Sequence, residues 1–225
     1  MTPPAARWAH LEVVLFDLDG TLIDSAPDLG RAANAMRLDR GLAALPVEQY
    51  RPHGGSGARG MLGQAFGVAP GDAAYDNLRQ EFLERYERVM HDNTHLFDGV
   101  AEELAALDAA GLRWGIVTNK AERFALPLAA ALGLSAAAIV GGDTTGFTKP
   151  HPEPLLEAAR RLNVQPSTCL YVGDDARDIT AGRAAGMATA VARWGYLGPH
   201  AEPSSWRADI ELLAPRDLLK ALKVA

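Results

Sequence analysis

The stretch Leu15-Phe16-Asp17-Leu18-Asp19-Gly20-Thr21-Leu22 follows Val13 and Val14, so an apolar run ends at two acids one residue apart. Such a run is typical of a strand buried on both faces of a parallel sheet. In open α/β sheets, ligands bind beyond the carboxyl ends of the strands, where Asp17 and Asp19 would lie. Two neighbouring carboxylates repel each other there, and a bound divalent cation would remove that cost. The stretch therefore predicts a parallel α/β sheet with a cation site at its edge.

Three later segments place further polar residues where the same edge would be. Residues 112–117 form a mostly apolar run, interrupted by Arg113, that is typical of a second strand and ends at Thr118-Asn119-Lys120. Residues 169–172 form another, which leads into Gly173-Asp174-Asp175-Ala176-Arg177-Asp178. Between them lies Phe147-Thr148-Lys149-Pro150. Because the carboxyl ends of parallel strands meet at one edge of a sheet, we expect these side chains to converge.

Taken in order, these four segments resemble the four motifs of the haloacid dehalogenase (HAD) superfamily, in the form typical of its phosphatases and phosphomutases. The resemblance covers nearly the whole chain. It implies that Asp17 is the nucleophile and becomes an aspartyl phosphate, a role that suits a group already ionised at neutral pH. It also implies that the Thr118 hydroxyl holds the phosphoryl group and that Lys149 balances the charge on the phosphate and the nucleophile.

The resemblance further implies a Mg²⁺ site, because Mg²⁺ prefers hard oxygen ligands. Asp17, the backbone carbonyl of Asp19 and the side chain of Asp174 would supply the protein oxygens. Asp178 would act indirectly, through water or through Lys149. We expect Asp175 to cap the helix that follows it rather than to bind the metal.

Asp19 indicates which bond is cleaved. A carboxyl group two residues from the nucleophile can protonate the leaving oxygen and then deprotonate the attacking water. Family members that cleave carbon–halogen or carbon–phosphorus bonds lack this second acid. The presence of Asp19 therefore favours phosphate esters as substrates.

Between the first and second motifs the sequence changes character. Leu29, Ala32, Ala33 and Met36 recur at helical spacing, as do Leu78, Phe82 and Val89, and no convincing strand is found up to about residue 95. Ser25 is a candidate N-cap for the first of these helices. We expect an α/β fold with a doubly wound, mostly parallel Rossmann-like sheet and a small inserted α-helical cap. The predicted core is 1–24 and 96–225, and the predicted cap is 25–95.

The rest of the core alternates strand and helix patterns. Residues 137–140 and 188–191 read as further strands, and residues 152–163 and 177–185 as helices. This alternation is the pattern of a doubly wound sheet.

Substrate choice should depend on the cap, and its glycine-rich loop is the segment Arg51-Pro52-His53-Gly54-Gly55-Ser56-Gly57-Ala58-Arg59. Gly55 and Gly57 would let the backbone approach a ligand closely, and Arg51 could pair with a carboxylate on it. Asn119, which follows the motif hydroxyl, is a further candidate for substrate contact. The loop is similar to that of phosphoglycolate phosphatases, and also to that of N-acetylmuramic acid 6-phosphate phosphatases. Both substrates carry a carboxylate, so Arg51 does not separate them.

Composition and charge agree with an ordinary globular enzyme. The 225 residues carry a net charge of −6, which provides no basic face for nucleic acid. No apolar stretch is long enough to span a membrane, and residues 1–10 lack the order of a signal peptide. The single cysteine, Cys169, excludes an internal disulfide. We expect a cytoplasmic monomer or homodimer whose partner is a small phosphorylated metabolite.

Three functions are compatible with these observations. The first is a Mg²⁺-dependent phosphatase, with 2-phosphoglycolate as the first candidate substrate and N-acetylmuramic acid 6-phosphate or another sugar phosphate as the alternative. The second is a mutase similar to β-phosphoglucomutase. Such mutases usually carry a His and a Lys in the cap, and residues 24–31 contain neither. The third is a non-catalytic binding module that keeps the fold, which the complete set of chemical residues disfavours.

Overall fold

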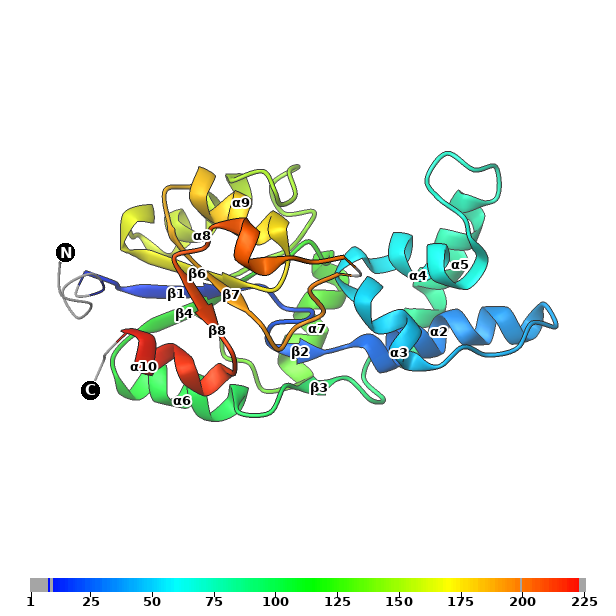
Figure 1. Ribbon diagram of the computed structural model, residues 1–225, viewed down its shortest axis with the longest axis horizontal. Helices are drawn as coiled ribbons and strands as arrows, with labels where there is room; N and C mark the ends of the chain where they lie inside the picture. Colours follow the sequence, from blue (N-terminus) through cyan, green and yellow to red (C-terminus); the bar gives the residue numbers. More distant parts are fainter. Residues whose placement is uncertain (1–7, 9, 199, 223–225) are drawn as a thin grey trace.

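A six-stranded sheet forms the centre of the protein in a computed structural model that describes residues 8, 10–198 and 200–222 (Figure 1). The strand order is β5-β4-β1-β6-β7-β8. All neighbouring strands are parallel. The strands are β1 (Val13–Phe16), β4 (Arg113–Val117), β5 (Ile139–Val140), β6 (Cys169–Gly173), β7 (Ala188–Ala192) and β8 (Ile210–Leu212).

Helices cover both faces of this sheet, as a doubly wound fold requires. Helices α8 (Glu153–Leu162) and α9 (Ala176–Ala184) lie on one side (Figure 1). On the other side lie α6 (Val100–Ala109), α7 (Glu122–Ala131) and α10 (Leu218–Leu222). Alternate residues of each strand enter different apolar clusters: Val13 and Leu15 pack with α8 and α9, and Val14 and Phe16 pack with the other helices. The expected α/β fold is confirmed.

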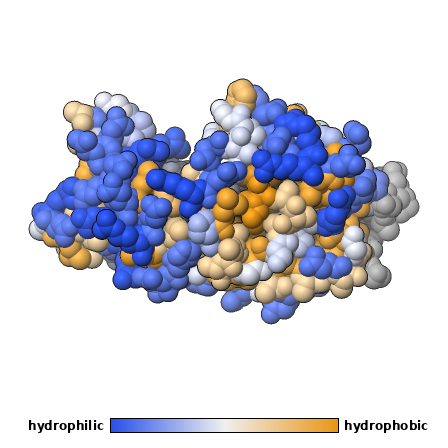
Figure 2. Space-filling model, turned by 180° about the vertical axis from the view of Figure 1, so that it is seen from behind, coloured by the Kyte–Doolittle hydropathy of each residue, from blue (hydrophilic) through white to orange (hydrophobic). Residues whose placement is uncertain are grey.

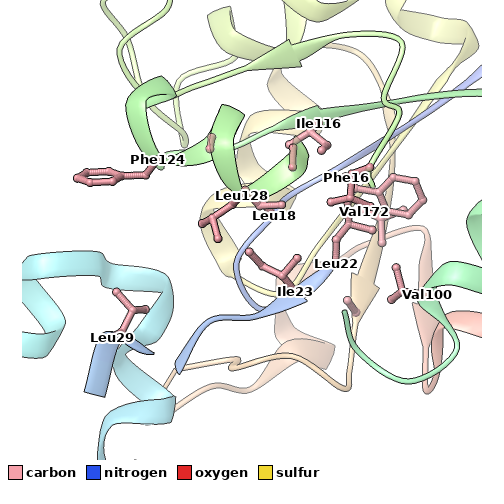
Figure 3. Close-up of a cluster of buried hydrophobic side chains, with 14 of the residues drawn as sticks. Phe16, Leu18, Leu22, Ile23, Leu29, Val100, Ile116, Phe124, Leu128 and Val172 are labelled. Carbon is pink, nitrogen blue, oxygen red and sulfur yellow. The ribbon is translucent and has the colours of Figure 1, made fainter. Parts of the chain in front are cut away.

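A group of helices stands beyond one end of the sheet, in the position expected for the inserted cap (Figure 1). It consists of α2 (Ala26–Asp39), α3 (Val47–Tyr50), α4 (Gly57–Phe66) and α5 (Tyr75–Val89). Its apolar residues continue one of the two sheet clusters, and Figure 3 labels members from both parts, among them Phe16 and Ile116 of the strands and Leu29 of α2. From behind, the helical group is mostly hydrophilic, whereas apolar side chains gather over the sheet part (Figure 2). The division of the chain into two domains stays a prediction, and parts of its outer ranges lie outside the described residues.

Two short strands at the junction were not predicted from the sequence. The chain leaves the sheet through β2 (Ile23–Asp24) and returns through β3 (His95–Leu96), and the two pair antiparallel. A two-residue strand is too short to produce a periodic pattern. The pairing places the two crossings of the chain side by side.

Two further expectations are corrected, and one segment without a predicted element is now assigned. The strand predicted over residues 137–140 covers only Ile139–Val140. Ser25 occupies the N-cap position of α2, but its side chain makes no capping bond because its hydroxyl donates to Asp19. The segment after residue 195, which the sequence left unexplained, supplies the sixth strand of the sheet, β8.

Short 3₁₀ helices complete the chain: η1 (Arg51–Ser56), η2 (Pro166–Thr168), η3 (Pro203–Trp206) and η4 (Pro215–Asp217). Within the described part of the chain, none of the helices has the length and apolar character needed to cross a bilayer.

Candidate active site

A cavity of about 540 Å³ lies between the carboxyl edge of the sheet and the helical group. Most of the residues singled out in the sequence line it. They are Asp17, Asp19, Gly55, Gly57, Thr118, Asn119, Lys149, Asp174 and Asp178. Segments up to 161 residues apart in the chain, counted from Asp17 to Asp178, thus contribute to one site.

A buried lysine lies between two acids at the centre of the site. Lys149 Nζ is 2.9 Å from Asp17 Oδ1 and 2.7 Å from Asp178 Oδ1. Burial by itself would lower the pKa of Lys149, but the two carboxylates outweigh it and raise the pKa above its ordinary value. Lys149 therefore remains a cation in contact with the predicted nucleophile.

Asp174, at the end of β6, is the second acid of the predicted metal site and is 2 % exposed. Its carboxylate accepts hydrogen bonds from Thr21 Oγ1 at 3.1 Å and from the Tyr196 amide at 2.8 Å. Burial, together with the charges of Asp17 and Asp178, raises its pKa well above the ordinary value. The loop after β1 approaches closely because residue 20 is glycine: a Cβ there would lie 2.3 Å from Asp174 Oδ2.

The acids form a cluster that fits a divalent cation. Asp17, Asp174 and Asp178 each offer a carboxylate oxygen, and these oxygens lie within 4.8 Å of one another. Burial raises the pKa of Asp178 to about 6 even though Lys149 opposes the shift. Three close carboxylates share one ammonium group, so negative charge remains for a cation to neutralise, and carboxylate oxygens suit a hard one.

Asp19 contacts different side chains from those that Asp17 contacts. Both of its carboxylate oxygens accept from Lys120 Nζ, at 3.1 and 3.0 Å, and the Ser25 hydroxyl also donates to it. Burial opposes the charge on Lys120, but Asp19 outweighs it and keeps the pKa of Lys120 above its ordinary value. Sequence analysis did not identify Lys120 or Ser25 as part of the site, although Lys120 lies two residues after Thr118 in the second segment.

Thr118 and Asn119 follow β4, and they differ in what their side chains contact. Thr118 is buried at the wall of the cavity, and its hydroxyl accepts from the Lys120 amide at 3.2 Å. The Asn119 amide group bonds the backbone of Lys149 in both directions, at 2.8 and 2.9 Å. Asn119 lines the cavity, but its polar atoms are engaged in holding the Lys149 loop. The structure thus gives it a positioning contact where sequence analysis expected a contact with substrate.

Arg51 is placed differently from the sequence expectation. It is not among the described residues that line the cavity. Its Nη1 lies 2.6 Å from Asp24 Oδ2, at the junction between the sheet and the helices. Because Asp24 is buried, this carboxylate needs a cationic partner, and Arg51 provides it. His53 is likewise absent from the described lining residues.

Arg177 and Tyr196, which sequence analysis did not select, connect the sheet edge to the helical group. Asp175 caps α9, as expected, and its carboxylate also binds the Arg177 guanidinium. That guanidinium donates to the Gly55 carbonyl at 2.7 Å. From the C-terminal part of the chain, the Tyr196 hydroxyl accepts from the amides of Ser25 and Ala26 at the start of α2.

Tyr86 on α5 is an unusual wall residue. Its hydroxyl is buried and makes no hydrogen bond of normal geometry among the described residues. Burial foremost raises the pKa of Tyr86 to about 12. Lys120 Nζ lies 4.7 Å from the centre of its ring, so Tyr86 covers the Lys120–Asp19 pair from the helical side.

The edge of a doubly wound sheet here brings together a carboxylate in contact with a buried lysine, a threonine hydroxyl and a cluster of three acids that could hold a metal ion, an arrangement that suits an α/β enzyme acting on phosphate. The chain belongs to the haloacid dehalogenase-like hydrolases, whose family model matches residues 11–186.

Relatives with known names agree with this class. The chain is 44% identical to an N-acetylmuramic acid 6-phosphate phosphatase of Pseudomonas putida over 218 residues, which cover 96% of this chain and 98% of the relative. It is 48% identical to a phosphoglycolate phosphatase of Xanthomonas campestris pv. campestris over 207 residues, which cover 91% and 93%. The crystal structure of a predicted phosphoglycolate phosphatase from Haemophilus somnus 129pt superposes with a TM-score of 0.82 at 27% identity, covering 94% and 98%. The protein is a phosphoric monoester hydrolase.

Proposed function

We propose that the protein hydrolyses a small phosphomonoester with Mg²⁺ as cofactor and Asp17 as the group that is transiently phosphorylated. The observation that carries the proposal is the contact of Asp17 with Lys149 inside a cluster of three carboxylates. Asp17, Asp174 and the backbone carbonyl of Asp19 would hold the ion, with Asp178 acting through Lys149. When bound, Mg²⁺ supplies positive charge against the phosphoryl oxygens and orients the group for in-line attack.

Two displacements complete the reaction. Asp17 attacks phosphorus, the bond from phosphorus to the ester oxygen breaks, and Asp19 donates a proton to that oxygen. Water then attacks the phosphorus of the aspartyl phosphate and gives a proton to Asp19. The bond from phosphorus to the Asp17 oxygen breaks, so that phosphate is released and Asp17 is restored. Throughout, Lys149 balances the charge on the phosphoryl group, and the Thr118 hydroxyl donates to one of its oxygens.

Residues 25–95 act in this proposal as a cap over a core made of 1–24 and 96–225. The hydrogen bond from Arg177 to the Gly55 carbonyl joins the fourth motif to the cap loop, and Gly55 and Gly57 line the cavity. Closure of the cap would keep bulk water from the site while Asp17 is phosphorylated, and opening would release the product.

The first candidate substrate is 2-phosphoglycolate, supported by the 48% identity to a phosphoglycolate phosphatase. The second is N-acetylmuramic acid 6-phosphate, supported by a relative of 44% identity that aligns over almost its whole length. The cavity favours this second candidate: at about 540 Å³ it is of the size that accommodates larger ligands, about 300–1,000 Å³, and a two-carbon ester would leave much of it to water.

Phosphate release in the presence of Mg²⁺ tests the proposal, with 2-phosphoglycolate, N-acetylmuramic acid 6-phosphate, β-glucose 1-phosphate and several other sugar phosphates as the panel. We expect the highest kcat/KM for one of the two carboxylated esters. Isomerisation of β-glucose 1-phosphate without net phosphate release would replace the phosphatase by a mutase. The absence of any turnover with Mg²⁺ would leave a binding module.

A further inference from the structure

The cations of the cavity fall into two groups. Six lysine or arginine side chains line it. Lys120, Lys149 and Arg177 each lie within 3.0 Å of a carboxylate oxygen. The other three have no ion-pair partner in the part of the chain that the structure describes, and they are Arg59, Arg79 and Arg123.

The unpaired arginines and the acids come from different elements. The lining acids that take part in the predicted chemistry follow β1 and β6. Arg59 lies on α4 and Arg79 on α5, in the helical group, and Arg123 lies in the first turn of α7. Asp143, a further lining acid, follows β5, and its carboxylate accepts from the amide of Glu122. The cavity thus has an acidic sheet side and helices that carry guanidinium groups without partners.

From this arrangement we propose that Arg59, Arg79 and Arg123 form a subsite for a second anionic group, carried by the organic part of the substrate. The inference rests on the proposed function, since it assumes that the phosphate ester is bound at Asp17 and Lys149. A guanidinium binds a carboxylate or a phosphate through two parallel hydrogen bonds, so three unpaired ones that line the same cavity favour an anion there. A carboxylate is the group that both candidate substrates share.

The placement of Arg51 and Arg123 supports this assignment. Arg51 forms an ion pair with the buried Asp24 and is not among the described residues that line the cavity. A carboxylate on the substrate would therefore need a different cationic partner from the one expected from the sequence. The Arg123 guanidinium lies 4.4 Å from the ring centre of Phe124, a contact that orients the group without neutralising its charge. Its hydrogen-bond donors remain available to a ligand.

The cavity volume adds a constraint on the substrate. At about 540 Å³, the space can hold a hexose phosphate together with an acidic substituent. The subsite therefore selects a sugar phosphate that bears a carboxylate over the same sugar phosphate without one.

The test uses a matched pair of esters: N-acetylmuramic acid 6-phosphate and N-acetylglucosamine 6-phosphate, which differ by the carboxylated lactyl ether. We expect the wild-type kcat/KM to favour the carboxylated ester by about tenfold or more. Arg59→Ala, Arg79→Ala and Arg123→Ala should each lower that preference, mainly by raising KM for the carboxylated ester and leaving KM for the neutral one nearly unchanged. Arg88→Ala is the control, because Arg88 is an exposed arginine on α5 outside the described lining.

The outcomes separate the subsite from the function on which it rests. Equal kcat/KM for the two esters in the wild type, or an undiminished preference in all three variants, would overturn the subsite and leave the phosphatase intact. A preference for glucose 1,6-bisphosphate over glucose 6-phosphate that the same variants abolish would keep the subsite and assign it to a second phosphate. No phosphate release from any ester would overturn both proposals.

Discussion

The charged groups on the two sides of the cavity differ in burial and in ion pairing. At the sheet edge the ionised groups are buried or half-buried and are partnered within the protein: Lys149 contacts Asp17 and Asp178, and Lys120 contacts both oxygens of Asp19. On the helices, Arg59 and Arg79 are exposed and lack an ion-pair partner among the described residues. Buried, fixed groups cost no reorganisation when charge develops, which suits chemistry. Exposed, unpaired groups are free to meet a ligand, which suits recognition.

This contrast implies that substitutions at the sheet edge should abolish turnover of every ester, whereas substitutions on the helices should change which ester is preferred.

Asp17→Asn should lower kcat by at least about 1,000-fold with every ester, because the amide is not a nucleophile. The fold should persist, since the substitution removes a repulsive charge from the acid cluster. Phosphate release and thermal unfolding measure the two effects, and Asp76→Asn, an exposed acid on α5, is the control. Turnover within tenfold of the wild type would show that another group attacks the ester.

Lys149→Met should destabilise the metal-free protein by about 3–5 kcal/mol, because Asp17 and Asp178 lose the cation that lies between them. For a chain of this size, that corresponds to a fall in Tm of about 10 °C. Lys220→Met, which changes an exposed lysine of α10, should have little effect. A Tm equal to the wild type would mean that the buried acids do not depend on Lys149.

Mg²⁺ should stabilise the protein, and more so at neutral than at acid pH. The pKa of Asp178 in the folded protein, about 6, lies above the ordinary 3.8, so the folded state binds more protons than the unfolded state between these values. Stability of the metal-free protein therefore falls as pH rises through that window, and the raised pKa of Asp174 acts in the same direction.

Bound Mg²⁺ removes this penalty, but at low pH it must displace protons. At about 100 times the dissociation constant we expect a gain near 2.7 kcal/mol at about pH 7.5, or about 5–10 °C in Tm, and a smaller gain at about pH 5. Differential scanning calorimetry with Mg²⁺ and with a chelator measures it. An equal gain at both pH values would contradict the assignment of the ion to these acids.

Arg51→Ala should have the smallest effect on catalysis. The Arg51 guanidinium is partly exposed, but Asp24 is buried and would keep only its hydrogen bonds from the Tyr196 hydroxyl and the Ala26 amide, so the loss of the ion pair should cost about 1–3 kcal/mol and lower Tm by several degrees. KM for a carboxylated ester should change less than it does in Arg79→Ala. A larger rise in KM for Arg51→Ala would return the carboxylate contact to the cap loop and weaken the assignment to the helices.

The sequence predicted the sheet edge well for a physical reason. Asp17 and Asp174 each follow a continuous apolar run and Thr118 follows a mostly apolar one, and such runs mark buried parallel strands whose carboxyl ends must converge. The family resemblance then supplied the chemical roles. The fold class followed from the same alternation of strand and helix patterns.

The remaining contacts depend on tertiary structure that no local pattern records. Lys120 meets Asp19 across 101 positions of sequence, and Tyr196 meets Ser25 across 171. The predicted apolar face of α5 consisted of Leu78, Phe82 and Val89. In the structure, Phe82 and Tyr86 are buried, whereas Leu78 and Val89 are only half-buried. The buried face therefore differs from the predicted one, and Tyr86 was not selected as a wall residue. The contact of Arg51 with Asp24, a buried partner at the junction, could not be recognised before the fold was known, and a contact of Arg51 with substrate stays a prediction.

The most direct test of the account is to trap the phosphorylated enzyme. The protein would be mixed with Mg²⁺ and the preferred ester carrying labelled phosphorus, quenched in acid within milliseconds and digested, and the labelled peptide sequenced. We expect label on Asp17, at a level that rises before steady-state phosphate release and disappears in Asp17→Asn. Rapid phosphate release with no labelled enzyme, or with label on a different residue, would contradict it.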